Sequence, residues 1–125
     1  MNPSKEKIPL SDEALEMVAG RFRCLGEPIR LKIIRALEPG EANVGQLVEM
    51  LHATQANVSK HLKVLVDAGI LARRPQGTAA FYHIADPLVM QLCQIVCDAL
   101  AEKLRSQAEV LGLTVTAENE GEQSR

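Results

Sequence analysis

Three cysteines carry the most reactive chemistry in this chain of 125 residues. Cys93 and Cys97 are four residues apart in an apolar stretch with helical spacing, which places their β-carbons about 5 to 6 Å apart on one side of a helix. A disulfide needs roughly 3.5 to 4.5 Å between β-carbons, whereas a soft ion bound at about 2.3 Å to each sulfur tolerates a wider spacing. The pair therefore favours chelation of a thiophilic ion over direct oxidation.

Cys24 is the candidate third thiol ligand. It lies at the end of an expected helix over residues 11–25, and it joins the pair if that helix packs on the last helix in one dimer interface. Three thiolates suit arsenite, antimonite, cadmium or lead, so we expect an As(III)-like ion to bind at Cys93, Cys97 and Cys24. The alternative is that these side chains only pack, because cysteine is among the most buried residue types.

A second group of side chains points to double-stranded DNA. Thr54 is a candidate N-cap for a helix over about 55–68, and the first turns of that helix carry residue types that read base edges or meet phosphates. The expected DNA contacts are Thr54, Gln55, Ala56, Asn57, Ser59, Lys60, His61 and Lys63, followed on a hairpin by Arg73, Arg74 and Thr78. From residue 52 to residue 84 four basic side chains oppose one acidic side chain, although the whole chain has a net charge of -2.

The apolar spacing predicts five helices and one hairpin that position these residues. The helices are expected at 11–25, 28–38, 44–51, 55–68 and 88–111, with two strands on either side of Gln76-Gly77. Gly69 falls where a left-handed helix cap belongs. Two short helices joined by a tight connection and followed by a hairpin form a winged helix-turn-helix, in which the second helix of the pair enters a major groove.

The predicted fold class is therefore mainly α with a small β-hairpin, in the order α-α-α-α-β-β-α. We expect an N-terminal arm at 1–10, a DNA-binding and dimerisation domain at 11–111 and a disordered acidic tail at 112–125. The last helix carries two adjacent rows with apolar and thiol side chains, which is wider than packing on a small core requires. These rows are Leu92, Val96, Ala99 and Lys103, and Cys93, Cys97, Leu100 and Leu104. A second copy of the chain is the expected cover.

Composition excludes several other classes of protein. Apolar residues make up 46% and charged residues 24%, values typical of a globular domain, and no apolar run approaches the roughly 20 residues of a membrane span. No signal peptide is visible at the N-terminus, so a cytoplasmic protein is expected. Aromatic residues are only 2%, which disfavours a base-stacking surface. An enzyme is not expected, because the chain has no phosphate loop, nucleophile elbow or paired catalytic carboxylates.

The chain resembles the ArsR/SmtB family of bacterial winged-helix repressors from about Met17 to Leu111. The stretches that carry the resemblance are FRCLGEPIRLKIIRAL (22–37), VGQL (44–47), QANVSKHLKVLVDAGIL (55–71) and RRPQGTAAFYHI (73–84). The resemblance implies a homodimer joined through the first and last helices. It also implies a palindromic operator that is released when an inducer binds.

The family's familiar inducer sites are incomplete in this sequence. The thiolate motif at the start of the third helix is replaced by Asn43-Val44-Gly45, and Leu88 and Ala99 occupy the histidine positions of the zinc site, to which Asp86 and Glu102 could otherwise belong. The three cysteines remain as the set of soft ligands. We therefore expect a repressor released by a thiophilic ion. The alternatives are a thiol-redox or persulfide-responsive repressor, although Arg35 lies near the position of one family redox cysteine, and a winged-helix module that binds protein instead of DNA.

Overall fold

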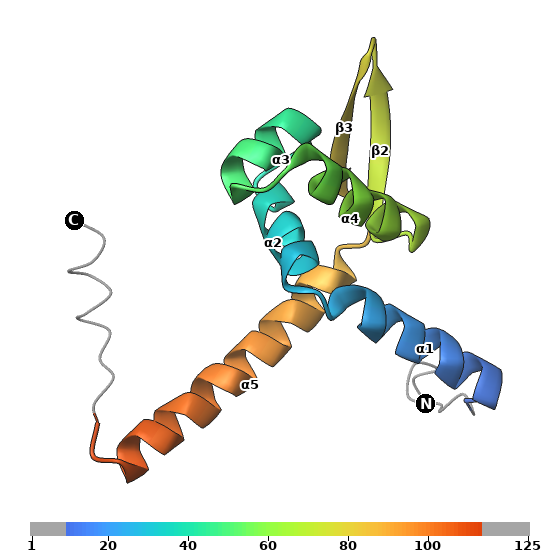
Figure 1. Cartoon of the computed structure of the whole chain (residues 1–125). Helices are drawn as coiled ribbons and strands as arrows, with labels where there is room; N and C mark the ends of the chain where they lie inside the picture. Colours follow the sequence, from blue (N-terminus) through green and yellow to red (C-terminus); the bar gives the residue numbers. More distant parts are fainter. Residues whose placement is uncertain (1–9, 114–125) are drawn as a thin grey trace. The chain divides into compact units, whose positions relative to one another are not determined.

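The computed structural model describes residues 10–113, so the expected arm and acidic tail fall almost entirely outside the described residues. The elements in chain order are α1 (Asp12–Leu25), α2 (Pro28–Leu37), β1 (Ala42–Asn43), α3 (Val44–Leu51), α4 (Gln55–Asp67), β2 (Leu71–Gln76), β3 (Ala79–Ile84) and α5 (Leu88–Val110). The chain divides into two compact units, the first ending at Asp86 and the second beginning at Pro87. The predicted winged helix-turn-helix is confirmed, and it occupies the first unit (Figure 1).

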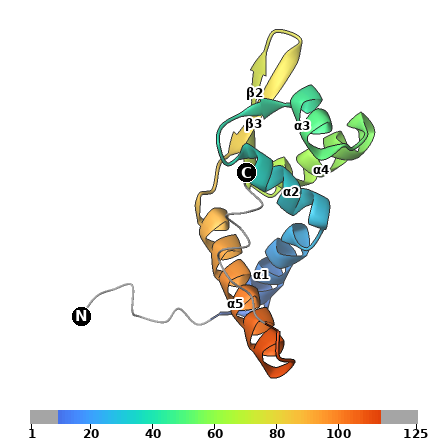
Figure 2. The same ribbon diagram turned by 90° about the vertical axis from the view of Figure 1, so that its left-hand side faces the viewer.

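The core of the first unit forms where α2, α3, α4 and the base of the hairpin meet. Its side chains are almost completely buried; they are Ile33, Ile34, Leu47, Val58, Leu62, Leu65, Ile70 and Leu71. Both views show α3 and α4 side by side, with the hairpin of β2 and β3 projecting beyond them (Figures 1 and 2). Burial of these aliphatic groups holds the two helices together and leaves the outer face of α4 to solvent.

Short polar caps set where α2, α3 and α4 begin. Pro28 stands at the first position of α2, where its missing N–H costs nothing. Asn43 and Gln46 form a reciprocal capping box at α3: each side-chain oxygen accepts the other residue's backbone N–H, at 2.8 and 2.9 Å. The Thr54 hydroxyl accepts the N–H of Asn57 at 3.2 Å and so caps α4, as the sequence predicts.

The end of α4 confirms the role predicted for Gly69. Its φ is +76°, in the left-handed region, and its N–H donates to the carbonyl of Val66 at 2.9 Å. The N–H of Ile70 donates to the carbonyl of Leu65 at 3.0 Å, and both of these side chains are fully buried. This pair of bonds is a Schellman motif, and it turns the chain from α4 directly into β2.

The sheet differs from the prediction of a two-stranded wing. It has three antiparallel strands in the order β1-β3-β2, and β1 pairs Ala42 with Tyr82 and Asn43 with Phe81. The sequence does not predict β1 because a strand of two residues is too short to show the alternation of apolar and polar side chains that marks a strand. The hairpin itself closes at Gly77, whose φ of +61° permits the tight connection between β2 and β3.

α1 is tied to the end of α4 by a polar contact. Arg21 donates from Nη1 to the carbonyl of Ala68 at 2.8 Å and forms an ion pair with Asp86. Only the last turn of α1, at Cys24 and Leu25, is buried. The large apolar side chains before it are exposed, including Phe22 at 56%. α1 therefore presents an uncovered apolar face.

α5 is a single helix of 23 residues whose apolar side chains are largely exposed. They include Ile95, Val96, Leu100, Leu104 and Val110. Within residues 10–113, no helix is both long and apolar enough to cross a bilayer. Like α1, α5 has an apolar face without a cover in the described chain.

Candidate nucleic-acid interface

The outer face of α4 carries the side chains expected to read DNA. All of those predicted on this helix except His61 are exposed; they are Gln55, Ala56, Asn57, Ser59, Lys60 and Lys63, with Thr54 at the cap. The inner face is held by Val58, Leu62 and Leu65, which are almost fully buried. The N-terminus of α4 also presents backbone N–H groups and the positive end of the helix dipole, which attract phosphate.

His61 corrects one part of the predicted interface. His61 is only 7% exposed, and its Nδ1 accepts a hydrogen bond from Nε of Arg30 at 3.0 Å. Burial, together with the positive charges of Arg30 and Lys60, lowers the pKa of His61, so the neutral imidazole is favoured. The expected exposure of His61 is wrong, because this side chain faces inward with Val58, Leu62 and Leu65 at helical spacing.

Arg30 extends this contact to a third element. Its Nη1 donates to the backbone carbonyl of Cys24, at the end of α1, at 3.0 Å. One side chain of α2 therefore joins the last turn of α1 to the middle of α4. The sequence does not predict this connection, because His61 lies 31 residues beyond Arg30 and only folding brings it beside the guanidinium, although Cys24 and Arg30 are just six residues apart.

Lys63 has an acidic partner on its own helix. Its Nζ lies 3.1 Å from Oδ2 of Asp67, one turn further along α4. Both side chains are largely exposed, at 78% and 63%, so the pair contributes little to stability and the ammonium can exchange its partner for a phosphate.

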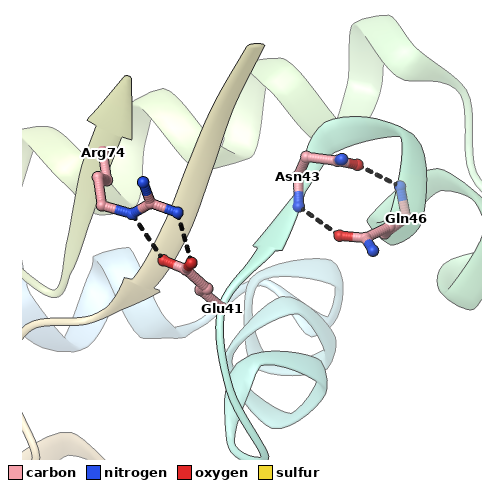
Figure 3. A network of polar contacts seen from close by, with 4 residues as sticks. All are labelled: Glu41, Asn43, Gln46 and Arg74. Carbon is pink, nitrogen blue, oxygen red and sulfur yellow. Dashed lines mark hydrogen bonds and ion pairs between the residues drawn. The ribbon is translucent and has the colours of Figure 1, made fainter. Parts of the chain in front are cut away.

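The wing presents two arginines with different surroundings. Arg73 and Arg74 are both exposed, as is Thr78 beside the turn. Arg74 donates from Nε and Nη2 to the two carboxylate oxygens of Glu41, at 3.1 and 2.6 Å (Figure 3). Its guanidinium also lies 5.1 Å from the centroid of the Phe81 ring. The hydrogen bond from Arg74 lowers the pKa of Glu41, and the carboxylate in turn raises the pKa of Arg74, so both groups are charged at neutral pH.

The sequence does not predict a role for Glu41. It stands 33 residues before Arg74, in the segment between α2 and β1, and nothing in its local sequence distinguishes it from a solvated surface glutamate. Only the antiparallel pairing of β1 with β3 brings it near the wing.

The three thiols are free and differ in burial. Cys24 is buried in the first unit, whereas Cys93 is half-buried and Cys97 exposed on α5 of the second unit. Burial, and secondarily the charge of Cys97, raises the pKa of Cys93, so its thiol is protonated at neutral pH. Among residues 10–113, the structure contains no group of three or more His, Cys, Asp or Glu side chains placed to hold a metal ion.

A capped helix with an exposed polar face, its partner helix and a basic wing together define a winged helix-turn-helix DNA-binding protein. Comparison with known sequences agrees with this class. Residues 27–73 match the arsR family of bacterial regulatory proteins. The transcriptional repressor SmtB of Mycobacterium tuberculosis is 36% identical over 93 residues, which are 74% of this chain and 67% of SmtB. A probable mercury resistance operon repressor of Streptomyces lividans is 33% identical over 102 residues, or 82% of this chain and 78% of that protein.

Solved structures show the same architecture. Rv0081 of M. tuberculosis is 30% identical and superposes with a TM-score of 0.71 over 78% of this chain and 99% of Rv0081. Mb0332 of Mycobacterium bovis, described as a homodimeric winged helix-turn-helix DNA-binding domain, is 25% identical with a TM-score of 0.69 over 82% of this chain and 94% of that domain. The chain belongs to the ArsR/SmtB family of transcriptional repressors, which are DNA-binding regulators and not enzymes.

Proposed function

We propose that this chain is a homodimeric repressor that holds operator DNA through α4 and the wing of each subunit and releases it when a thiophilic ion binds its cysteines. The observation that carries the DNA-binding part is the exposed row of short polar side chains at the start of α4, above the buried anchors Val58 and Leu62. Such a row can approach base edges because the anchors fix the helix against the core.

The residue types on α4 divide into base-reading and phosphate-binding roles. Gln55 and Asn57 are suited to bidentate contacts with adenine, and Ala56 can lie against a thymine methyl group. Ser59 and Lys60 reach phosphates or guanine, and the Thr54 hydroxyl is already used as the helix cap. On the wing, Arg73 and Thr78 are exposed for contacts with the DNA backbone.

The exposed apolar faces of α1 and α5 support a homodimer. Phe22 on α1 and Leu100 on α5 are each more than half exposed, and apolar patches of this kind mark association surfaces. A relative of the same fold, Mb0332, is described as homodimeric. A twofold-paired molecule presents two copies of α4 to half-sites about 34 Å apart on one face of the duplex.

The thiols of α5 support a soft-ion inducer. Cys93 and Cys97 are one helical turn apart, and the raised pKa of Cys93 keeps it a thiol until a cation displaces the proton. A redox sensor instead needs a thiolate with a lowered pKa. The name of the S. lividans relative, a mercury resistance repressor, supports the same class of ligand. We assign Cys93 and Cys97 as the primary ligands of an As(III)-like ion and Cys24 as the third. By linkage, that ion binds the free dimer more tightly than the DNA-bound one.

The test measures affinity of the full chain for a duplex from upstream of its own gene, with and without arsenite. Release by arsenite that is lost in Cys93→Ser and Cys97→Ser supports the inducer site, with Ser106→Ala on the same helix as the matched control. Release that persists in both cysteine variants refutes the site. Release by oxidant, reversed by reductant and insensitive to arsenite, refutes it in favour of a redox switch.

A further inference from the structure

Glu41 and Arg74 meet across the full width of the sheet. Glu41 directly precedes β1, Arg74 lies on β2, and β3 runs between these strands. Phe81 of β3 is in register with Asn43 on one side and with Arg74 on the other. The guanidinium of Arg74 lies over the Phe81 ring, 5.1 Å from the ring centroid. Its Nε and Nη2 donate hydrogen bonds to the Glu41 carboxylate. Figure 3 shows the side chains of Arg74 and Glu41 facing one another.

The geometry of this pair holds Arg74 in one place. Nε and Nη2 of Arg74 each donate to one carboxylate oxygen of Glu41, and this planar bidentate contact is the one that a guanidinium makes best. The aromatic ring adds an attraction for the cation from a second direction. A DNA phosphate has to displace Glu41 before it can engage the same edge of the guanidinium. The paired charges also cancel, so they add no net positive charge to the wing.

The pair spans a weak point of the fold. β1 has only two residues, and its second residue, Asn43, is also the N-cap of α3. Two ladder positions alone give a short and weak attachment between strands. Glu41 and Arg74 supply a second attachment between the hairpin and the segment from which α3 begins. The buried side chains of Ile70 and Leu71 hold the base of the hairpin, and Arg74, three residues further along β2, adds a polar attachment to Glu41 beyond that base.

We propose that Arg74 is a positioning residue which, through Glu41, fixes the wing relative to the helix-turn-helix, and that the exposed Arg73 makes the phosphate contact on that strand. This inference rests on the proposed function, because it concerns how the two parts of the DNA-binding surface are held together. It reassigns Arg74, for which the sequence alone predicted a phosphate contact.

A phosphate contact and a positioning role can be distinguished by the number of DNA phosphates that the protein neutralises, which sets the slope of affinity against salt concentration. Affinity of the full chain for its upstream duplex is measured over a range of salt concentrations in the wild type, Arg73→Gln, Arg74→Gln and Glu41→Gln. Arg73→Gln is expected to lower the salt slope by about 1.8 per dimer, since each lost phosphate contact removes about 0.9. Arg74→Gln and Glu41→Gln are expected to weaken binding by about threefold to tenfold with the slope unchanged, as for contacting pairs that act through geometry.

The charge-swapped variant, Glu41→Arg with Arg74→Glu, is the deciding control. It restores an ion pair with the opposite polarity, so recovery of affinity supports the positioning role even if either single variant unfolds. A folded swap variant that stays as weak as the single variants overturns the proposal. A lowered salt slope in Arg74→Gln, or tighter binding in Glu41→Gln, also overturns it, since either result makes Arg74 a phosphate ligand that Glu41 merely covers.

Failure of the proposed function gives a different result. A wild-type chain with no salt-dependent affinity for its upstream DNA refutes DNA binding, whatever the wing variants do. The positioning role is then decided by amide hydrogen exchange in β2 and β3. Faster exchange in Glu41→Gln than in the wild type supports the link, and unchanged exchange overturns it.

Discussion

Replacing Arg30 with methionine tests the polar connection inside the first unit. Arg30 lies on α2, donates to the Cys24 carbonyl at the end of α1 and donates to Nδ1 of His61 on α4, with both bonds at 3.0 Å. Methionine keeps an apolar stem of similar length and removes both donors. The substitution leaves two acceptors without a partner in residues that are only 8% and 7% exposed.

The expected loss of unfolding free energy is about 3 kcal/mol. A hydrogen bond to a charged group contributes about 1.5 to 3 kcal/mol, and we take the low end for each bond because Arg30 itself is only half-buried. For a domain of roughly 100 residues, 1 kcal/mol corresponds to about 4 to 8 °C. The melting temperature is therefore expected to fall by roughly 12 to 24 °C.

Urea and thermal unfolding at fixed protein concentration measure this loss, and pH separates the contribution of His61. Because the pKa of His61 is lowered in the folded state, the contribution of His61 to wild-type stability is full above the unfolded pKa of about 6.5 and is lost as the pH falls through the lower folded value. Arg30→Met removes a positive charge beside the imidazole, so its stability should fall less steeply over that range.

Arg35→Met is the matched control for this substitution. Arg35 lies on the same helix and is exposed, so its replacement should change stability by no more than about 0.5 kcal/mol. Equal effects of Arg30→Met and Arg35→Met, or an unchanged pH dependence in Arg30→Met, would refute the reasoning.

Three further substitutions test local features. Gly69→Ala should cost about 1 kcal/mol in urea unfolding, because an added Cβ meets nothing within 4 Å and only the left-handed backbone opposes it; no loss would contradict the cap at α4. Asn43→Ala should cost about 1 kcal/mol by removing the capping box of α3, and a neutral result would rule out that role. Lys60→Gln should weaken DNA binding and lower the salt slope by about 1.8 per dimer, whereas an unchanged slope would remove Lys60 from the phosphate contacts.

The helices were predictable because their ends carry local chemical signals. Thr54 and Gly69 delimit α4 to within a residue of the expected bounds, since capping depends on nearby side chains and backbone conformation. The unusually wide apolar stripe of α5 likewise predicted the exposed face that the structure shows.

The polar contacts of the interface were not predictable in the same way. His61 was placed on the DNA face by its residue type, although its spacing from Val58 and Leu65 matches the buried side of α4. The pairing of Glu41 with Arg74 depends on β1, a strand too short to leave a pattern. Tertiary contacts between distant segments decide both cases, and a single sequence does not display them.

The most direct test of the account is the affinity of the full chain for DNA from upstream of its own gene, compared with a scrambled duplex of equal length. We expect a preference for the upstream duplex, affinity that falls steeply with salt, and two protected half-sites about 34 Å apart. We also expect that Gln55→Ala with Asn57→Ala reduces the preference while the salt slope stays unchanged. Equal affinity for both duplexes, or protection of a single site by a monomer, would contradict it.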